Sequence, residues 1–154
     1  MLYEVSGDLL MQDADIICHQ TNFSGVMGAG VAASIRRKLL TDSLFREYET
    51  LCRQKGKTLL GTVQFLKIRE GCYVANLFCQ NDWNTGSVLT NYDAARTCLF
   101  EVARFASAEK LRVALPGGMG CGIAGGDWNR VSEILHEVFD RSEVSCTVVF
   151  RKRQ

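Results

Sequence analysis

Two glycine-rich segments, 25–30 and 117–126, contain the residues best suited to binding a ligand. The second lies within 115–128, which holds six of the fourteen glycines and the single proline. Glycine loses much backbone entropy on ordering, so this cluster indicates positive φ angles or backbone that a ligand approaches closely. Amides at a turn beside a helix N-terminus can bind phosphate. Two such loops could hold two linked phosphates; the alternative is a flexible surface loop.

Known nucleotide fingerprints do not account for these loops. Neither segment contains the G-x-x-x-x-G-K-[ST] pattern, which disfavours a P-loop nucleotidase. Residues 120–125 do match G-x-G-x-x-G. A dinucleotide fingerprint, however, opens a first βαβ unit, with an acidic residue about 20 positions further on. Here the unit comes last in the chain, so the match alone indicates little.

Three side chains near the loops could take part in catalysis. His19 ends an apolar run, and its imidazole could act as a general base or be a structural histidine of the core. Asp127 could activate a water or simply cap a helix. The amide-rich loop around Cys121 could lower its pKa. No base accompanies Cys121 in the sequence, which favours a backbone contact over a nucleophilic thiol.

Alternating strands and helices must position these residues. Such alternation favours a largely parallel sheet with helices on both faces, and a hairpin at 62–78 makes it mixed. Both glycine loops follow strands, so both are expected at the carboxyl edge of the sheet, where ligands bind. The polar stretch 79–89 is predicted to be a loop. Strands are predicted near 2–5, 14–18, 62–68, 72–78, 111–115 and 144–150, and helices near 29–39, 41–52, 90–105 and 127–140.

Length and composition indicate one globular domain over residues 1–154. The net charge of +1 argues against bulk binding to nucleic acid or anionic lipid, and 151–153 is interpreted as a solvated basic tail. The N-terminus shows no signal peptide, and no stretch reaches the roughly 18 apolar residues of a membrane span. We therefore expect a cytoplasmic protein. Its seven dispersed cysteines are expected to be reduced core residues, and with two histidines a zinc site is disfavoured.

Four motifs in order resemble the macrodomain family, and together they span essentially the whole chain. They are Gly7-Asp8-Leu9, the run 14–22 ending His19-Gln20-Thr21-Asn22, the run 25–31, and Gly120-Cys121-Gly122 continuing to Trp128. The resemblance is closest to the branch that contains small ADP-ribose-1″-phosphate-processing macrodomains and terminal ADP-ribose protein glycohydrolases. It implies a three-layer α/β/α sandwich with a mixed sheet, which binds ADP-ribose across two loops.

The resemblance also implies roles for individual residues. Asp8 would accept a hydrogen bond from the adenine amino group beside the Leu9 amide, and Asn22 would contact the distal ribose. Both residue types are also common in turns, which is the alternative for each. Phe150 could stack on adenine or be a core aromatic. The loop residues predicted to surround the diphosphate and distal ribose are Gln20, Gly28, Ala29, Gly30, Val31, Gly118, Met119, Gly120, Cys121, Gly122, Ile123 and Ala124.

The catalytic positions of that branch differ in this chain. Where its glycohydrolases carry a lysine, this chain has 78–81 without lysine, and Ala124 stands in the place of their aspartate. Asp127 follows three residues later. Two functions are therefore open, and a third, an RNA- or nucleotide-binding module, is disfavoured by the near-neutral charge. The first is hydrolysis of ADP-ribose-1″-phosphate or an ester-linked ADP-ribosyl group, assisted by His19 or Asp127. The second is ADP-ribose binding without catalysis. We expect a monomer without metal or cofactor, and a nucleic-acid partner is disfavoured.

Overall fold

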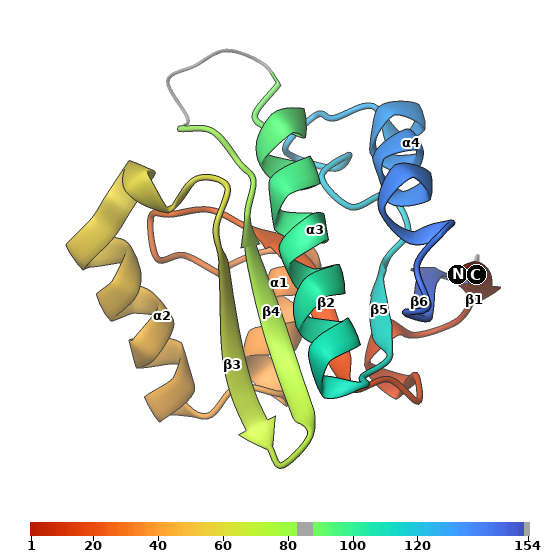
Figure 1. Ribbon diagram of the computed structural model, residues 1–154. Coiled ribbons are helices and arrows are strands. Elements are labelled where there is room, and N and C mark those ends of the chain that lie inside the picture. The colour runs from red at the N-terminus through yellow and green to blue at the C-terminus, as the bar shows by residue number, and fades with distance from the viewer. Residues whose placement is uncertain (83–87, 153–154) are drawn as a thin grey trace.

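Six strands form one sheet in the order β1-β6-β5-β2-β4-β3 in the computed structural model, which describes residues 1–82 and 88–152 (Figure 1). Every neighbouring pair is parallel except β3 and β4, which form the predicted antiparallel hairpin. The predicted mixed, largely parallel sheet is therefore confirmed. The strands are β1 (Leu2–Ser6), β2 (Ile16–Thr21), β3 (Val63–Arg69), β4 (Cys72–Phe78), β5 (Val113–Pro116) and β6 (Cys146–Phe150).

Helices cover both faces of the sheet, which confirms the three-layer arrangement. The helices α3 and α4 lie on one face, while α1 and α2 lie on the other (Figure 1). Two short 3-10 helices, η1 and η2, accompany them. The described helices are η1 (Leu9–Met11), α1 (Gly30–Lys38), α2 (Asp42–Lys55), η2 (Gly56–Leu59), α3 (Tyr92–Glu109) and α4 (Trp128–Phe139).

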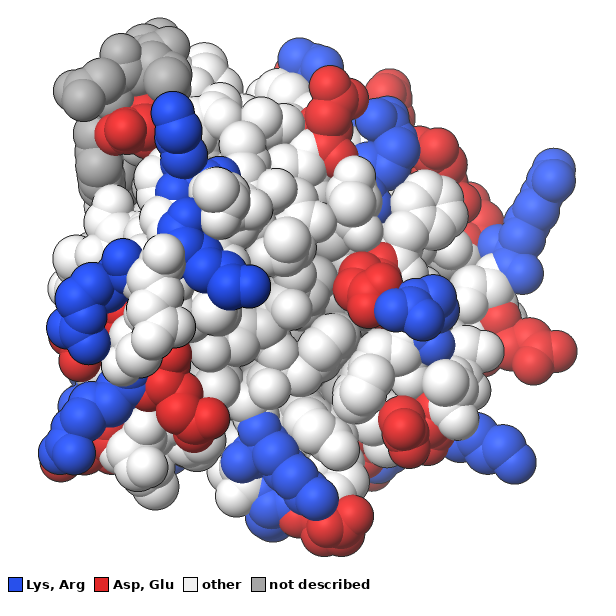
Figure 2. All heavy atoms as spheres, turned by 60° about the vertical axis from the view of Figure 1, so that its left-hand side comes forward, with Lys and Arg blue, Asp and Glu red and all other residues white. Residues whose placement is uncertain are grey.

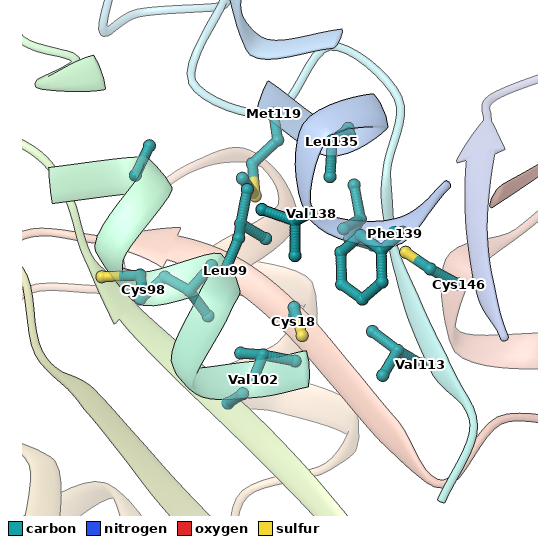
Figure 3. Close-up of a cluster of buried hydrophobic side chains, with 14 of the residues drawn as sticks. Cys18, Cys98, Leu99, Val102, Val113, Met119, Leu135, Val138, Phe139 and Cys146 are labelled. Atoms are coloured by element: carbon teal, nitrogen blue, oxygen red, sulfur yellow. The ribbon is translucent and has the colours of Figure 1, made fainter. Parts of the chain in front are cut away.

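Strand β2 contributes to the core on both sides because successive side chains point to opposite faces. Ile16 and Cys18 pack with α3 and α4, whereas Ile17 packs with the residues beneath α1 and α2. Figure 3 shows Cys18 among the buried side chains between the sheet and the helices α3 and α4, together with Met119 from the second glycine loop. Met119 is 4% exposed, so its side chain fastens that loop to the core.

Some boundaries differ from those the sequence predicts. Strand β2 continues to Thr21, and α3 is capped by Asn91, whose side chain accepts from the Ala94 amide. Thr90, at which the predicted helix 90–105 begins, is instead buried outside the helix. The predicted loop 79–89 falls partly outside the described residues, at 83–87.

The order of strands brings the two glycine loops together. β2 and β5 are parallel neighbours, with Ile16 opposite Val113. The first loop follows β2 and the second follows β5, so both leave the carboxyl edge of the sheet side by side. This is the edge at which α/β proteins bind ligands.

Charged side chains of both signs are interspersed on the face shown in Figure 2, around a broad area without charge. This face therefore presents no continuous basic track of the kind that binds a phosphate backbone. No helix in the described parts of the chain is both long enough and apolar enough to cross a membrane.

Candidate functional site

A cleft of about 440 Å³ lies between the two glycine loops. The structure brings together there most of the residues predicted to bind the ligand. Cys121, Asp127 and Phe150 do not line it, and Asp8 and Leu9 line a neighbouring cavity. The predicted residues that border the cleft are His19, Gln20, Asn22, Gly28, Ala29, Gly30, Val31, Gly118, Met119, Gly120, Gly122, Ile123 and Ala124.

Backbone amides without partners border the cleft on both sides. The N-cap of α1, Ala29, makes no side-chain hydrogen bond, and the amides of residues 30–32 at the helix start find no acceptor among the described residues. Across the cleft, the amides of Gly120 and of residues 122–124 likewise donate to no described acceptor. The helix dipole adds positive potential at the start of α1. Together these groups suit an anionic, phosphate-like ligand.

The second loop is held by close packing and a short polar chain. The Thr90 hydroxyl donates to the Gly120 carbonyl at 2.6 Å and accepts from Gln20 Nε2 at 3.1 Å. Gly120 has φ +76°, and an added Cβ would lie 2.7 Å from Gln20 Oε1. A Cβ on Gly126 would lie 2.6 Å from the Gly120 carbonyl oxygen. Space therefore requires glycine at position 126, and the positive φ angle together with the neighbouring side chains favours it at position 120.

The first loop is held by the side chain of Asn22. Its Oδ1 accepts from the amides of Ser24 and Val26 at 3.0 and 3.3 Å, while Nδ2 donates to the Val26 carbonyl at 2.9 Å. The buried Tyr48 hydroxyl donates to the Asn22 carbonyl at 2.8 Å. The side chain of Asn22 is thus engaged within its loop, which supports the turn-forming alternative over the contact with the distal ribose.

His19 is a buried residue at the floor of the cleft. Its ring is 1% exposed, and Nε2 lies 2.6 Å from Asn76 Oδ1; Asn76 Nδ2 in turn donates to Gln64 at 3.0 Å. Burial lowers the pKa of His19 from 6.5 to about 4, so the ring is neutral at neutral pH. His19 Nδ1 and the Thr21 hydroxyl, two residues further along β2, are buried without a partner among the described residues.

The positions of Asp127 and Cys121 favour structural roles. Asp127 Oδ1 accepts from the Asn129 amide at 2.9 Å as the N-cap of α4, which supports the capping interpretation. Cys121 Sγ donates to the Met119 carbonyl at 3.4 Å. Burial and the nearby Asp127 charge raise the pKa of Cys121, contrary to the lowered value considered from the sequence. The thiol is therefore less reactive than an ordinary cysteine.

Phe150 is partly buried against the core and lines neither the cleft nor the neighbouring cavity. Its ring meets Trp128 edge-on, with centroids 5.7 Å apart, and it covers Gly117, where an added Cβ would lie 2.3 Å from the ring. Phe150 belongs to the cluster beneath α3 and α4. Asp8 and Leu9 lie instead in a cavity bordered by α1. The core alternative for Phe150 therefore accounts for its position, because its ring packs with the cluster beneath α3 and α4, whereas Leu9 beside Asp8 packs with the cluster beneath α1 and α2.

The cavity next to the cleft has a volume of about 650 Å³ and contains Asp8 and Leu9. Asp8 Oδ1 caps η1 by accepting from the Leu10 amide at 2.9 Å. Gly30, Val31 and Arg151 border both cavities, so one ligand could extend through them.

Sequence reasoning missed several residues that line the two cavities. The sequence places Arg151 in a solvated basic tail, whereas in the structure it borders both cavities directly after the last strand. Gln80 lies in the cleft within the segment where the related branch carries a lysine. No signal in the sequence singles out Gln80. Among the described residues, no group of three or more His, Cys, Asp or Glu side chains could hold a metal ion.

Sequence comparison finds relatives among the DNA ADP-ribosyl glycohydrolases of Mycobacterium bovis and Mycobacterium tuberculosis. The DNA ADP-ribosyl glycohydrolase of Mycobacterium tuberculosis is 30% identical over 139 residues, which cover 88% of this chain. The matched region makes up 38% of that protein, so the chain spans well under half the length of its relative. No protein-family model matches the chain.

Solved structures share the fold. A Bacteroides thetaiotaomicron protein of unknown function is 30% identical with a TM-score of 0.85, covering 97% of this chain and 98% of that one. A macrodomain protein from Streptomyces coelicolor is 26% identical with a TM-score of 0.79, covering 97% and 98%. Thermosipho africanus DarTG, solved in complex with ADP-ribose, is 16% identical with a TM-score of 0.75, covering 99% of this chain and 43% of that one.

Proposed function

Because this chain has the macrodomain fold, we propose that it binds ADP-ribose, or an ADP-ribosyl group on a larger substrate, between its two glycine loops. The observation that carries the proposal is the pair of opposed rows of free amides, from 30–32 at the start of α1 and from Gly120 and 122–124 after β5. Two linked phosphates are the ligand that such a pair suits. The ADP-ribose in the DarTG structure supports the same ligand class.

The adjoining cavity extends this proposal to the adenosine end. Asp8 lies there, and its Oδ2 has no hydrogen-bond partner among the described residues. A carboxylate oxygen of this kind can accept a hydrogen bond from an exocyclic amine. In this orientation the adenosine occupies the cavity with Asp8, the diphosphate lies between the loops, and the distal ribose lies toward His19 and Gln80.

Calorimetry tests the binding proposal directly. ADP-ribose should bind, AMP should bind more weakly because it lacks the second phosphate and distal ribose, and Asp8→Ala should weaken ADP-ribose binding by about 1–3 kcal/mol. Glu4→Ala, which removes a carboxylate outside both cavities, is the matched control. No heat with ADP-ribose at high concentration would refute the proposal.

Hydrolysis of an ADP-ribosyl bond is the second candidate function. The 30% identity with a DNA ADP-ribosyl glycohydrolase favours it, and points to DNA-linked ADP-ribose as one substrate to test. Such a substrate would be recognised by its ADP-ribosyl group, so it needs no basic track on the protein. The other candidate substrates are ADP-ribose-1″-phosphate and ADP-ribose esterified to protein glutamate.

The titratable residues that line the cleft limit the chemistry. The described lining includes no carboxylate and no lysine, and its ionisable side chains are His19 and Arg151. Proton transfer would therefore depend on His19, whose burial makes the charged form costly. Incubation with the three substrates decides between the functions. Turnover abolished in His19→Gln but not in Asp127→Asn would support catalysis, whereas binding without turnover would leave a non-catalytic reader.

A further inference from the structure

Three cationic side chains line the cavity that contains Asp8. They are Lys38 at the end of α1 and Arg151 and Lys152 after β6. Within the described residues, none of the three lies within 4 Å of a carboxylate oxygen. Three cations and the single Asp8 carboxylate give this lining a formal charge of +2, although the whole chain carries +1. Positive charge is thus concentrated in one cavity.

The cavity offers a further hydrogen-bond donor, and its one carboxylate, that of Asp8, does not balance the three cations. The Ser34 hydroxyl on α1 also lines it and has no hydrogen-bond partner among the described residues. Asp8 is partly engaged, because its Oδ1 accepts from the Leu10 amide. Lysine, arginine and serine side chains together are a typical donor set for a phosphate group.

ADP-ribose itself does not account for this charge. In the orientation proposed above, its two negative charges lie beside the amides of the glycine loops. Arg151 borders both cavities and could approach that diphosphate, but Lys38 and Lys152 border only the cavity with Asp8. The group of an adenosine moiety that would lie among them is its ribose, which is uncharged. Two cations and a hydroxyl are therefore left without a matching group.

We propose that this cavity is a second anion subsite, which binds a phosphomonoester carried on the adenosine ribose. The proposal rests on the proposed function, because it uses the same orientation of the ligand. It predicts that the chain prefers ligands with an added phosphate on the adenosine ribose, of the class represented by ADP-ribose 2′-phosphate and the adenosine bisphosphates.

Calorimetry with matched pairs of ligands tests the subsite. ADP-ribose 2′-phosphate is compared with ADP-ribose, and adenosine 2′,5′- and 3′,5′-bisphosphate are each compared with AMP, at low and high salt. The expected result is about tenfold tighter binding of the 2′-phosphate or the 3′-phosphate form at low salt, with a smaller ratio at high salt. Equal or weaker binding of every phosphorylated form would overturn the proposal.

Substitution of the two lysines tests whether they cause the preference for the added phosphate. Lys38→Ala and Lys152→Ala should each reduce the ratio of affinities for the phosphorylated and unphosphorylated ligands, and the double variant should bring it close to one. Lys55→Ala is the control, because Lys55 ends α2 and lines neither cavity. An unchanged ratio in the folded double variant would refute the assignment of these lysines.

The two proposals fail separately. ADP-ribose binding without preference for an added phosphate removes the subsite and leaves the proposed function intact. Tighter binding of adenosine bisphosphates than of AMP, with no binding of ADP-ribose, keeps the subsite and refutes the proposed function.

Discussion

The two glycine loops border the same cleft but are stabilised by different means. The loop after β2 is held by one side chain, Asn22, which makes hydrogen bonds within the loop and lies against the buried Tyr48. The loop after β5 is held by close packing that leaves no room for a Cβ. The Phe150 ring would meet a Cβ at Gly117, the Gln20 and Thr90 side chains one at Gly120, and the Gly120 carbonyl one at Gly126. Both loops therefore use glycine for positive φ angles, and the second loop additionally needs glycine where no space is left for a side chain.

The largest effect is expected from Gly120→Ala. Alanine there would have a positive φ and would collide with Gln20 and Thr90, so we expect about 3 kcal/mol of destabilisation and loss of ADP-ribose binding. Gly122→Ala is the matched control, because nothing lies within 4 Å of its added Cβ. Denaturant unfolding of both variants measures the difference. Equal stability of the two variants would show that close packing around Gly120 does not hold the second loop, and would contradict the difference between the loops.

His19, in the strand β2 that leads into the first loop, should make the free energy of unfolding depend on pH. The folded-state pKa of about 4 lies below the ordinary 6.5, so between these values the unfolded chain takes up a proton that the folded chain does not. Stability is therefore complete above pH 6.5 and should fall by up to about 3 kcal/mol as the pH approaches 4. Unfolding measured across this range should show a smaller decrease in His19→Gln. His136→Gln, at an exposed histidine, is the control, and an equal decrease in both variants would contradict the prediction.

Asn22→Ala tests whether the first loop depends on its side chain. The variant loses the hydrogen bonds to the amides of Ser24 and Val26, and we expect about 2 kcal/mol of destabilisation together with weaker ADP-ribose binding. Tyr48→Phe removes the hydroxyl bond to the same loop and should cost about 1 kcal/mol. Thermal unfolding and calorimetry measure both effects. A smaller effect from Asn22→Ala than from Tyr48→Phe would show that the backbone, not the side chain, holds this loop.

The smallest effect is expected from Asp127→Ala at the end of the second loop. Loss of the α4 cap should cost about 1 kcal/mol, with ADP-ribose affinity unchanged because Asp127 lines neither cavity. Asn91→Ala, at the cap of α3, should cost a similar amount and is the matched control. Strongly reduced ADP-ribose affinity in Asp127→Ala, with stability unchanged, would assign Asp127 to the site.

The sequence predicts the fold and the two loops, but not the orientations and contacts of several side chains. Strand and helix order follows from apolar periodicity, and the glycine clusters mark where β2 and β5 end, so the fold and the loops of the cleft were predictable. The orientations of Phe150 and Cys121 depend on which face of the sheet or loop each side chain takes, and no local pattern determines this. The functions of Asn22 and Tyr48 depend on a contact across 26 positions, which one sequence does not reveal.

The parallel pairing of β1 with β6 has a consequence for how the molecule folds. Leu2 lies opposite Cys146, so this ladder closes a loop that contains almost the entire chain. The entropy of such closure opposes folding before any contact is gained, and pairings of this separation form slowly. The cavity between Asp8 and Arg151 takes one wall from each end of the chain. During refolding it should therefore form only once the two ends have met, and binding of an adenosine ligand would report that late event.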